Sequence, residues 1–121
     1  MLNRAPILIV EDEPFIAREL QASVEGAGGK VVGPVGSVSA ALALLQTEVV
    51  FAAILDVQLI DRDVTPVAEA LIALGVPIIF QSGVSLPPEL QRRCPDAIVY
   101  KKPASAEVLL KRLAGILRPL K

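Results

Sequence analysis

Ionisable and hydroxyl side chains follow four short apolar segments of the chain, directly where each segment ends. They are Glu11 with Asp12, Asp56, Ser82, and Lys101 with Lys102. Carboxylates gathered in one place repel one another unless one is protonated or a cation lies between them. Oxygen ligands that leave room for water and a phosphate oxygen suit Mg²⁺. An Asp beside Mg²⁺ can act as a nucleophile toward phosphorus, a role open to Asp56, with Ser82 and a lysine on the phosphoryl oxygens.

The spacing of apolar residues predicts how these side chains are positioned. Short β-type segments alternate with helical periods, which is typical of βα units around a parallel sheet with helices on both faces. The predicted strands are residues 7–10, a strand that begins at 31–32 and is closed by Gly33-Pro34, and residues 51–55, 77–80 and 98–100. The predicted helices are residues 14–27, 38–45 after Ser37 as cap, 65–75 with Thr65 as cap, a short one at 89–93, and 105–117. Ligands of such α/β folds bind beyond the carboxyl ends of the strands, where the four groups would meet.

Each of these groups also has a purely structural interpretation. The triplet Glu11-Asp12-Glu13 can favour the start of a helix through the helix dipole. Asp56 and Ser82-Gly83 can be turn residues, and Lys101-Lys102 can be a solvated pair. The coincidence of all four at the edge that the fold reserves for ligands favours the functional interpretation over the structural one.

Composition excludes several classes of function. The 121 residues make about one domain, and 53% hydrophobic against 21% charged residues favours a folded core. A net charge of -1 gives no basic excess for binding nucleic acid. The chain has no His and a single Cys, Cys94, so it has no imidazole ligand and no internal disulfide. Polar residues and prolines interrupt the longest uncharged stretch, 70–88, so we expect no membrane span and a cytoplasmic protein.

Four sequence segments together carry a resemblance that covers the whole chain. They are ILIVEDEP, AAILDVQL, PIIFQSG and VYKKP, in this order. With them, residues 1–121 resemble a CheY-like receiver domain of a two-component response regulator, of the single-domain type. The resemblance implies a flavodoxin-like sheet with strand order 2-1-3-4-5.

The resemblance also implies roles for the residues at the ends of the strands. Asp56 would be the phosphoacceptor, and Glu11 and Asp12 would hold Mg²⁺ with Asp56, directly or through water. The backbone carbonyl of Gln58 would complete the protein's metal ligands. Ser82 would take the hydroxyl position that senses the phosphoryl group. Lys102, directly before Pro103, would correspond to the lysine that receiver domains have before a proline.

The partners implied by the resemblance are proteins. A sensor histidine kinase or a phosphotransfer protein would supply the phosphoryl group, and a downstream protein target would receive the signal. Such a domain catalyses only its own phosphorylation and dephosphorylation, and many form homodimers. Direct contact with nucleic acid or a membrane is not expected.

Three features depart from the family's usual pattern. Val99 lies three residues before Lys102, where the family usually has a switch aromatic, and Tyr100 follows it. The segment VQLIDRD after Asp56 lacks the common Pro-Gly turn, and prolines leave room for only a short fourth helix. The segment PIIFQSGVS is similar to a subgroup named for a Phe-Ala-Thr-Gly-x-Tyr motif, although it lacks the Tyr.

Three other functions are alternatives to a phosphorylated receiver. The first is a receiver-like interaction module that works without phosphate, which Val99 favours. The second is a flavodoxin-like cofactor binder, but Glu11-Asp12-Glu13 stands where a phosphate loop would be, and only 3% of residues are aromatic. The third is a metal-dependent aspartyl-phosphate phosphatase, which would need a second acid near Asp56 and a capping domain.

Overall fold

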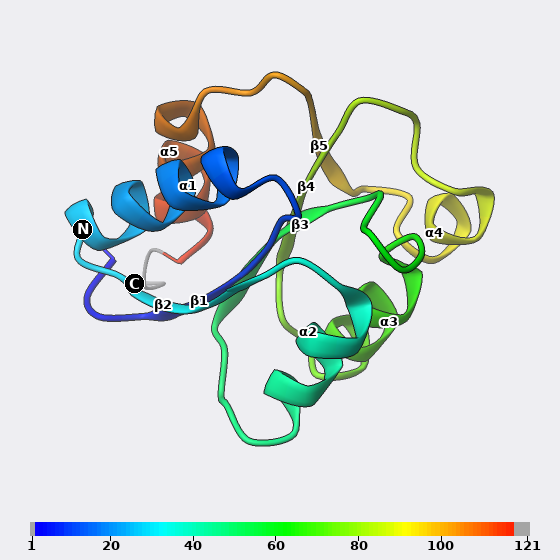
Figure 1. The fold of residues 1–121 in the computed structure, drawn as a ribbon, viewed down its shortest axis with the longest axis horizontal. Helices are drawn as coiled ribbons and strands as arrows, with labels where there is room; N and C mark the ends of the chain where they lie inside the picture. The colour runs from blue at the N-terminus through cyan, green and yellow to red at the C-terminus, as the bar shows by residue number, and fades with distance from the viewer. Residues whose placement is uncertain (1, 118–121) are drawn as a thin grey trace.

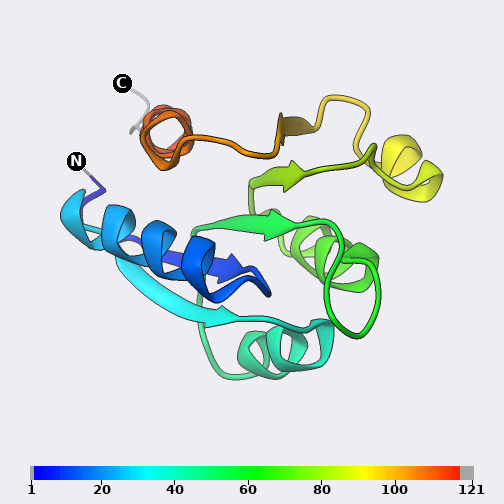
Figure 2. The ribbon, with the colours of Figure 1, turned by 45° about the horizontal axis from the view of Figure 1, so that its top comes forward.

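A computed structural model of the chain describes residues 2–117, and residues 1 and 118–121 of the predicted domain lie outside the described part. The fold is one parallel sheet in the order β2-β1-β3-β4-β5, as the family resemblance implied. Figure 2 shows the strands side by side in this order. They are β1 (Pro6–Val10), β2 (Lys30–Val35), β3 (Ala52–Asp56), β4 (Ile78–Ser82) and β5 (Ile98–Lys101).

Helices cover both faces of the sheet. They are α1 (Pro14–Gly26), α2 (Val38–Leu45), α3 (Thr65–Ala73), α4 (Pro88–Arg93) and α5 (Ala106–Ile116). Figure 1 shows α1 beside α5 on one side of the sheet, and α2 beside α3 on the other. Within residues 2–117 no helix is long and apolar enough to cross a membrane.

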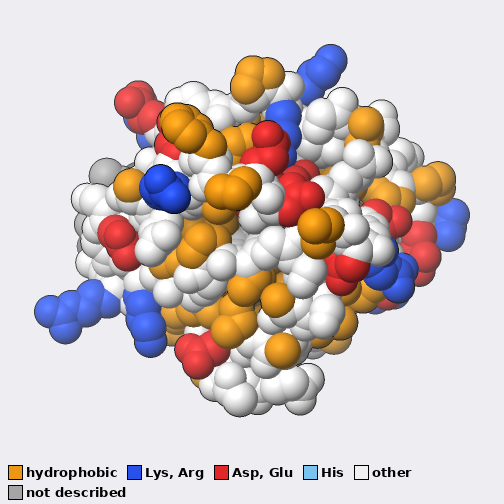
Figure 3. Space-filling model, in the orientation of Figure 1, with side chains coloured by type: hydrophobic (Ala, Val, Ile, Leu, Met, Phe, Trp, Pro, Cys, Tyr) orange, Lys and Arg blue, Asp and Glu red, His pale blue; other side chains and the backbone are white. Residues whose placement is uncertain are grey.

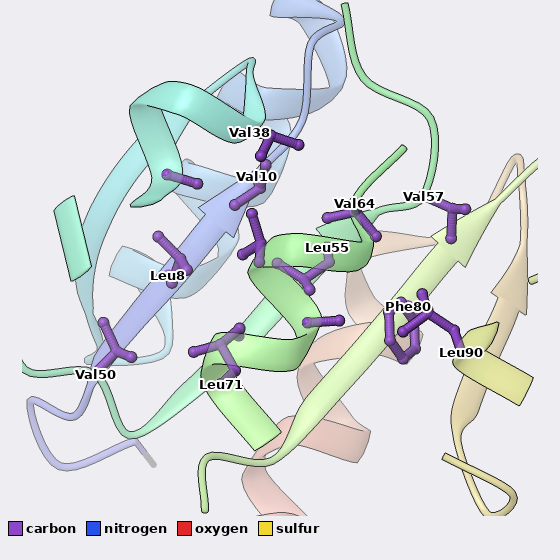
Figure 4. Packing of buried hydrophobic residues seen from close by; sticks show 14 of the residues in the cluster. Leu8, Val10, Val38, Val50, Leu55, Val57, Val64, Leu71, Phe80 and Leu90 are labelled. Carbon is purple, nitrogen blue, oxygen red and sulfur yellow. The ribbon is translucent and has the colours of Figure 1, made fainter. Parts of the chain in front are cut away.

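The sheet separates two hydrophobic cores. Successive side chains of a strand point to opposite faces, so β1 sends Leu8 and Val10 to the core under α2 and α3. Its Ile7 and Ile9 enter the core under α1 and α5. Figure 4 shows the first of these cores, in which Phe80 lies against Leu90 of α4. The central strands are therefore buried on both faces, and this packing holds their carboxyl ends in place.

Strand β2 differs from its predicted end. Gly33-Pro34 was expected to close this strand, but β2 continues through both residues to Val35. The register moves from Leu8 opposite Val32 to Val10 opposite Val35, so β2 accommodates an extra residue there. Gly33 has a φ of +99°, which favours glycine. Because β2 is an edge strand, Pro34 costs it no pairing with a further neighbour.

The helix boundaries agree with most of the predicted signals. Ser37 caps α2, and its hydroxyl oxygen accepts a hydrogen bond from the Ala40 N–H at 3.1 Å. Helix α4 is short, with six residues, as the neighbouring prolines predicted. The predicted cap Thr65 is instead the first residue of α3, and the Asp63 carboxylate accepts the Thr65 N–H at 2.9 Å. Val64 is the cap residue, and the Asp63 carboxylate accepts the first N–H of the helix.

Candidate functional site

Three carboxylates meet at the carboxyl ends of β1 and β3. Asp56 is the last residue of β3, while Glu11 and Asp12 directly follow β1, its neighbour in the sheet. One carboxylate oxygen from each of the three lies within 4.8 Å of the others. Glu11 and Asp56 are buried and Asp12 is exposed, so the cluster opens to solvent on one side. In Figure 3, acidic side chains (red) gather near the centre of the face, beside a basic one (blue).

The amine of Lys102 joins this cluster from the other side. Its Nζ lies 3.1 Å from Asp56 Oδ2, 2.9 Å from Glu11 Oε1 and 3.3 Å from Glu13 Oε2. Lys102 reaches the cluster because it follows the edge strand β5, and its backbone N–H donates to the Ser82 carbonyl at 2.9 Å. The Lys102-Pro103 peptide bond is cis. The Lys102 amine is thus within ion-pair distance of the Glu11, Glu13 and Asp56 carboxylates.

Burial and charge shift the pKa values of the two central groups. Burial raises the pKa of the Glu11 carboxyl to about 7, although its hydrogen bond from Lys102 acts in the opposite direction. Burial alone would lower the pKa of Lys102, but the hydrogen bonds to Glu11 and Asp56 outweigh it and raise that pKa. Lys102 therefore stays positively charged at neutral pH.

A pocket of about 310 Å³ opens beside Asp56. It is lined by Asp12, Glu13, Asp56, Gln58, Ser82, Gly83 and Lys102. Ser82 is buried, and its hydroxyl oxygen accepts the Val84 N–H at 3.1 Å. The structure thus brings all six predicted site residues to one place, with Glu11 at the base of the neighbouring carboxylate cluster. Lys101 is exposed and does not line this pocket; with Val99 it lines an adjoining one, which shares Ser82 and Gly83 with the pocket beside Asp56.

Asp61 ties the loop after β3 to the start of α2. Its two carboxylate oxygens accept the N–H groups of Val38, at 2.9 Å, and Ser39, at 3.1 Å. Within the loop, Gln58 pairs with Asp63 as an isolated antiparallel bridge. The segment that replaces the usual Pro-Gly turn is therefore held from outside by a helix N-terminus, where a negative charge is favourable. Gln58, on this loop, is positioned by these contacts.

Asp61→Ala is expected to lower the melting temperature at neutral pH, because two N–H groups of α2 lose their acceptors. The N–H of Val38, above all, holds the pKa of Asp61 below its ordinary value of 3.8. A lowered pKa gives stability that is present above 3.8 and is lost as the pH falls through the lower folded value. The difference in melting temperature between the parent chain and Asp61→Ala should shrink in acid. The same substitution at exposed Asp96 is the control, and an equal difference at all pH values would contradict this role for the carboxylate.

Two contacts of the site were not predicted from the sequence. Glu13 was assigned only to the acidic triplet, but its carboxylate reaches Lys102. Gln81 was not singled out, but its side-chain amide donates to Glu11 Oε1 at 2.9 Å. A signal for Gln81 was present in the sequence, since this polar residue directly follows the predicted apolar strand 77–80 and precedes Ser82; the observed β4 extends through both residues.

The donor set fits a magnesium ion. Mg²⁺ prefers oxygen ligands at about 2.0 to 2.1 Å, so opposite ligands lie about 4.2 Å apart. The three carboxylate oxygens, within 4.8 Å of one another, approach this spacing, and the open side admits water. The site has no thiolate and no imidazole, which softer metals prefer. Glu11, Asp12 and Asp56 could therefore hold Mg²⁺ with little movement.

Comparisons with known proteins agree with this architecture. No family model matches the chain, and the search of curated proteins gave no match. The chain is 39% identical to SdrG from Sphingomonas melonis Fr1, covering 98% of this chain and 100% of that one, with a TM-score of 0.79. A BeF3-activated conformation of SdrG, from Pseudomonas melonis Fr1, matches at 40% identity over the same shares, with a TM-score of 0.73.

A third solved structure is a CheY-like response regulator receiver domain protein from Methanospirillum hungatei JF-1. It is 25% identical over 93% of each chain, with a TM-score of 0.81. The strand order, the acidic cluster at the ends of β1 and β3, and a relative of 39% identity over nearly the whole length agree with one another. The chain belongs to the receiver-domain family of response regulators.

Proposed function

We propose that the chain accepts a phosphoryl group on Asp56 in a Mg²⁺-dependent reaction and passes the signal to a partner protein. One observation carries the proposal: the carboxylates of Glu11, Asp12 and Asp56 and the Lys102 amine meet at one edge of the sheet, from segments far apart in the sequence. The donor would be a phosphohistidine of a sensor histidine kinase or a phosphotransfer protein, since this chain has no His of its own. The chain would act on no external substrate.

The reaction follows from the position of Asp56. A carboxylate oxygen attacks the phosphorus, an O–P bond forms, and the P–N bond to the donor imidazole breaks. The imidazole nitrogen keeps the electron pair and takes up a proton. The residues that hold Mg²⁺ would be Glu11, Asp12 and Asp56, with the backbone carbonyl of Gln58. When bound, the metal would neutralise negative charge on the phosphoryl group during its transfer.

Lys102 and Ser82 are the groups of this chain that can contact the new phosphoryl oxygens. Phosphorylation replaces one negative charge on Asp56 by roughly two and adds acceptor oxygens. Lys102 Nζ already lies 3.1 Å from Asp56 Oδ2, so a short movement brings it to a phosphoryl oxygen. The buried Ser82 hydroxyl lines the same pocket. These two contacts link the modification to the ends of β4 and β5.

Intact-mass analysis after incubation with Mg²⁺ and a small-molecule phosphodonor tests the proposal. We expect one added phosphoryl group with Mg²⁺ and none when a chelator removes it. Because fast hydrolysis can hide the adduct, beryllium fluoride is added in a parallel amide NMR experiment. Absence of both an adduct and spectral changes around Asp56 would overturn the proposal.

A second candidate function is a receiver-like interaction module that works without phosphate. The observation in its favour is on β5, where Val99 is half-exposed while Tyr100 packs into the α1 and α5 core. The exposed position of Val99 therefore has no aromatic ring that could change its position when Ser82 moves. The beryllium fluoride experiment separates this module from the proposed phosphoacceptor.

Lys102→Met is expected to change metal affinity and stability in opposite directions. Two unit charges about 4 Å apart interact by about 4 kcal/mol at an effective dielectric constant of 20, so removing this cation should tighten Mg²⁺ binding by about tenfold or more. Without Mg²⁺ the free energy of unfolding should fall by about 2 kcal/mol, because buried carboxylates lose their counter-ion. Calorimetric titration and urea unfolding measure the two effects. Lys101→Met, next to it but outside the cluster, is the control, and weaker Mg²⁺ binding by Lys102→Met would contradict the prediction.

A further inference from the structure

Gln81 is a buried polar residue at the carboxylate cluster. It is only 1% exposed and lies in β4 after Ile78, Ile79 and Phe80. In the sheet it pairs with Asp56 of β3, so the two side chains leave their strands toward the same face. Side chains are seldom polar at such a depth unless they have a specific hydrogen-bond partner.

The partner of Gln81 is the carboxylate of Glu11. Gln81 Nε2 donates to Glu11 Oε1 at 2.9 Å, and Lys102 Nζ lies at the same distance from that oxygen. The Glu13 N–H donates to Glu11 Oε2 at 3.1 Å. The side chain of Glu11 is 0% exposed, so these protein donors stand in place of water around a buried carboxylate.

Two of these donors, the Lys102 amine and the Gln81 amide, differ in charge and in how firmly their positions are held. Lys102 is cationic, and it also contacts Asp56 and Glu13, so phosphorylation of Asp56 would draw it away from Glu11. Gln81 is neutral, and its backbone is fixed between β3 and β5. A neutral donor stabilises an ionised carboxylate without competing with a cation for the site. Nothing in this arrangement requires Gln81 to leave Glu11 when Lys102 moves to a phosphoryl group on Asp56.

We propose that Gln81 is a positioning residue of the metal site. Its amide holds the Glu11 carboxylate beside Asp12 and Asp56, and it continues to do so when Lys102 turns to the phosphoryl group. Residues that hydrogen-bond to metal ligands orient them, and their loss typically costs about 10-fold to 100-fold in metal affinity. The inference rests on the proposed Mg²⁺ binding and adds a residue to it.

The test is a calorimetric Mg²⁺ titration of Gln81→Met, which keeps the length of the side chain and removes the donor. We expect the dissociation constant for Mg²⁺ to rise about tenfold relative to the parent chain. The matched control is Gln91→Met, since the Gln91 amide also donates one hydrogen bond, to the Leu86 carbonyl at 2.7 Å, away from the site. Urea unfolding without Mg²⁺ is measured for both variants, because a merely structural role would lower stability and leave the Mg²⁺ dissociation constant unchanged.

Each outcome decides between the two proposals. If the parent chain binds no Mg²⁺, the proposed function fails and the role of Gln81 fails with it. If the parent chain binds Mg²⁺ and Gln81→Met binds it equally well, the positioning role alone is overturned. Should Gln81→Met not fold, the side-chain amide signals of Gln81 in the parent chain are followed by NMR during the titration. They must shift along the same binding curve, and signals that do not move would refute the inference.

Discussion

An Asp56→Asn variant is expected to take up no phosphoryl group under conditions that modify the parent chain completely. An amide at this position lacks the negative charge that attacks phosphorus, and one of the three carboxylates that would hold Mg²⁺ is lost as well. The remaining acids do not replace it, because Glu11 is held by three donors and Asp12 is exposed to solvent. Intact-mass analysis measures the loss directly.

The control for this variant is the same substitution at Asp96, an exposed acid away from the pocket. Asp96→Asn should be modified as fully as the parent chain. Circular dichroism of Asp56→Asn should show an unchanged fold, since the substitution is nearly isosteric. An Asp56→Asn chain that still gains one phosphoryl group would place the acceptor on a different residue.

Phe80→Ala is expected to lower the free energy of unfolding by about 3 to 5 kcal/mol. Phe80 is 1% exposed and is the largest fully buried side chain of the described residues. In Figure 4 its ring lies between β4 and Leu90, so the substitution leaves a cavity under the short helix α4. Leu90 is the one buried residue of α4, and it belongs to the same core cluster as Phe80. Urea unfolding monitored by circular dichroism measures the loss.

The matched control is Phe15→Ala. Phe15 is 82% exposed, so this substitution removes the same atoms from the surface instead of the core. Its effect on the free energy of unfolding should lie within about 0.5 kcal/mol. A similar loss in both variants would mean that burial of Phe80 is not the source of its contribution. Because small domains have only about 5 to 15 kcal/mol of stability, Phe80→Ala is best studied at low temperature.

The fold was predictable where the local signals were simple. The uninterrupted apolar segment 7–10 predicted a strand buried on both faces, and β1 is such a strand. Prolines at 87, 88 and 95 predicted a short fourth helix, which α4 confirmed. The predicted end of β2 was wrong, because Gly33-Pro34, considered by itself, is a turn signal. On an edge strand the same two residues are tolerated as a local irregularity, and only the position of β2 in the sheet decides between the two.

The site was predictable to the extent that strand ends determine it. The structure brings Glu11, Asp12 and Asp56 near one another, because parallel strands have their carboxyl ends at one edge of the sheet. The contacts made by Gln81 and Asp61 could not be predicted in the same way. Each depends on the reach of a side chain to another part of the chain, which residue spacing does not encode. Gln81 reaches Glu11, directly after β1, and Asp61 reaches the start of α2.

The double-sided burial of the central strands has a consequence for hydrogen exchange. Strand β3 is buried at every residue and has a neighbour on each side, so its amides should exchange only when the whole domain opens. Strand β5 is a half-buried edge of four residues, and its amides should exchange through smaller, local openings. Asp56 is the last residue of β3, and Lys102 directly follows β5. We therefore expect Asp56 to stay in place during the local openings that move Lys102 away from it.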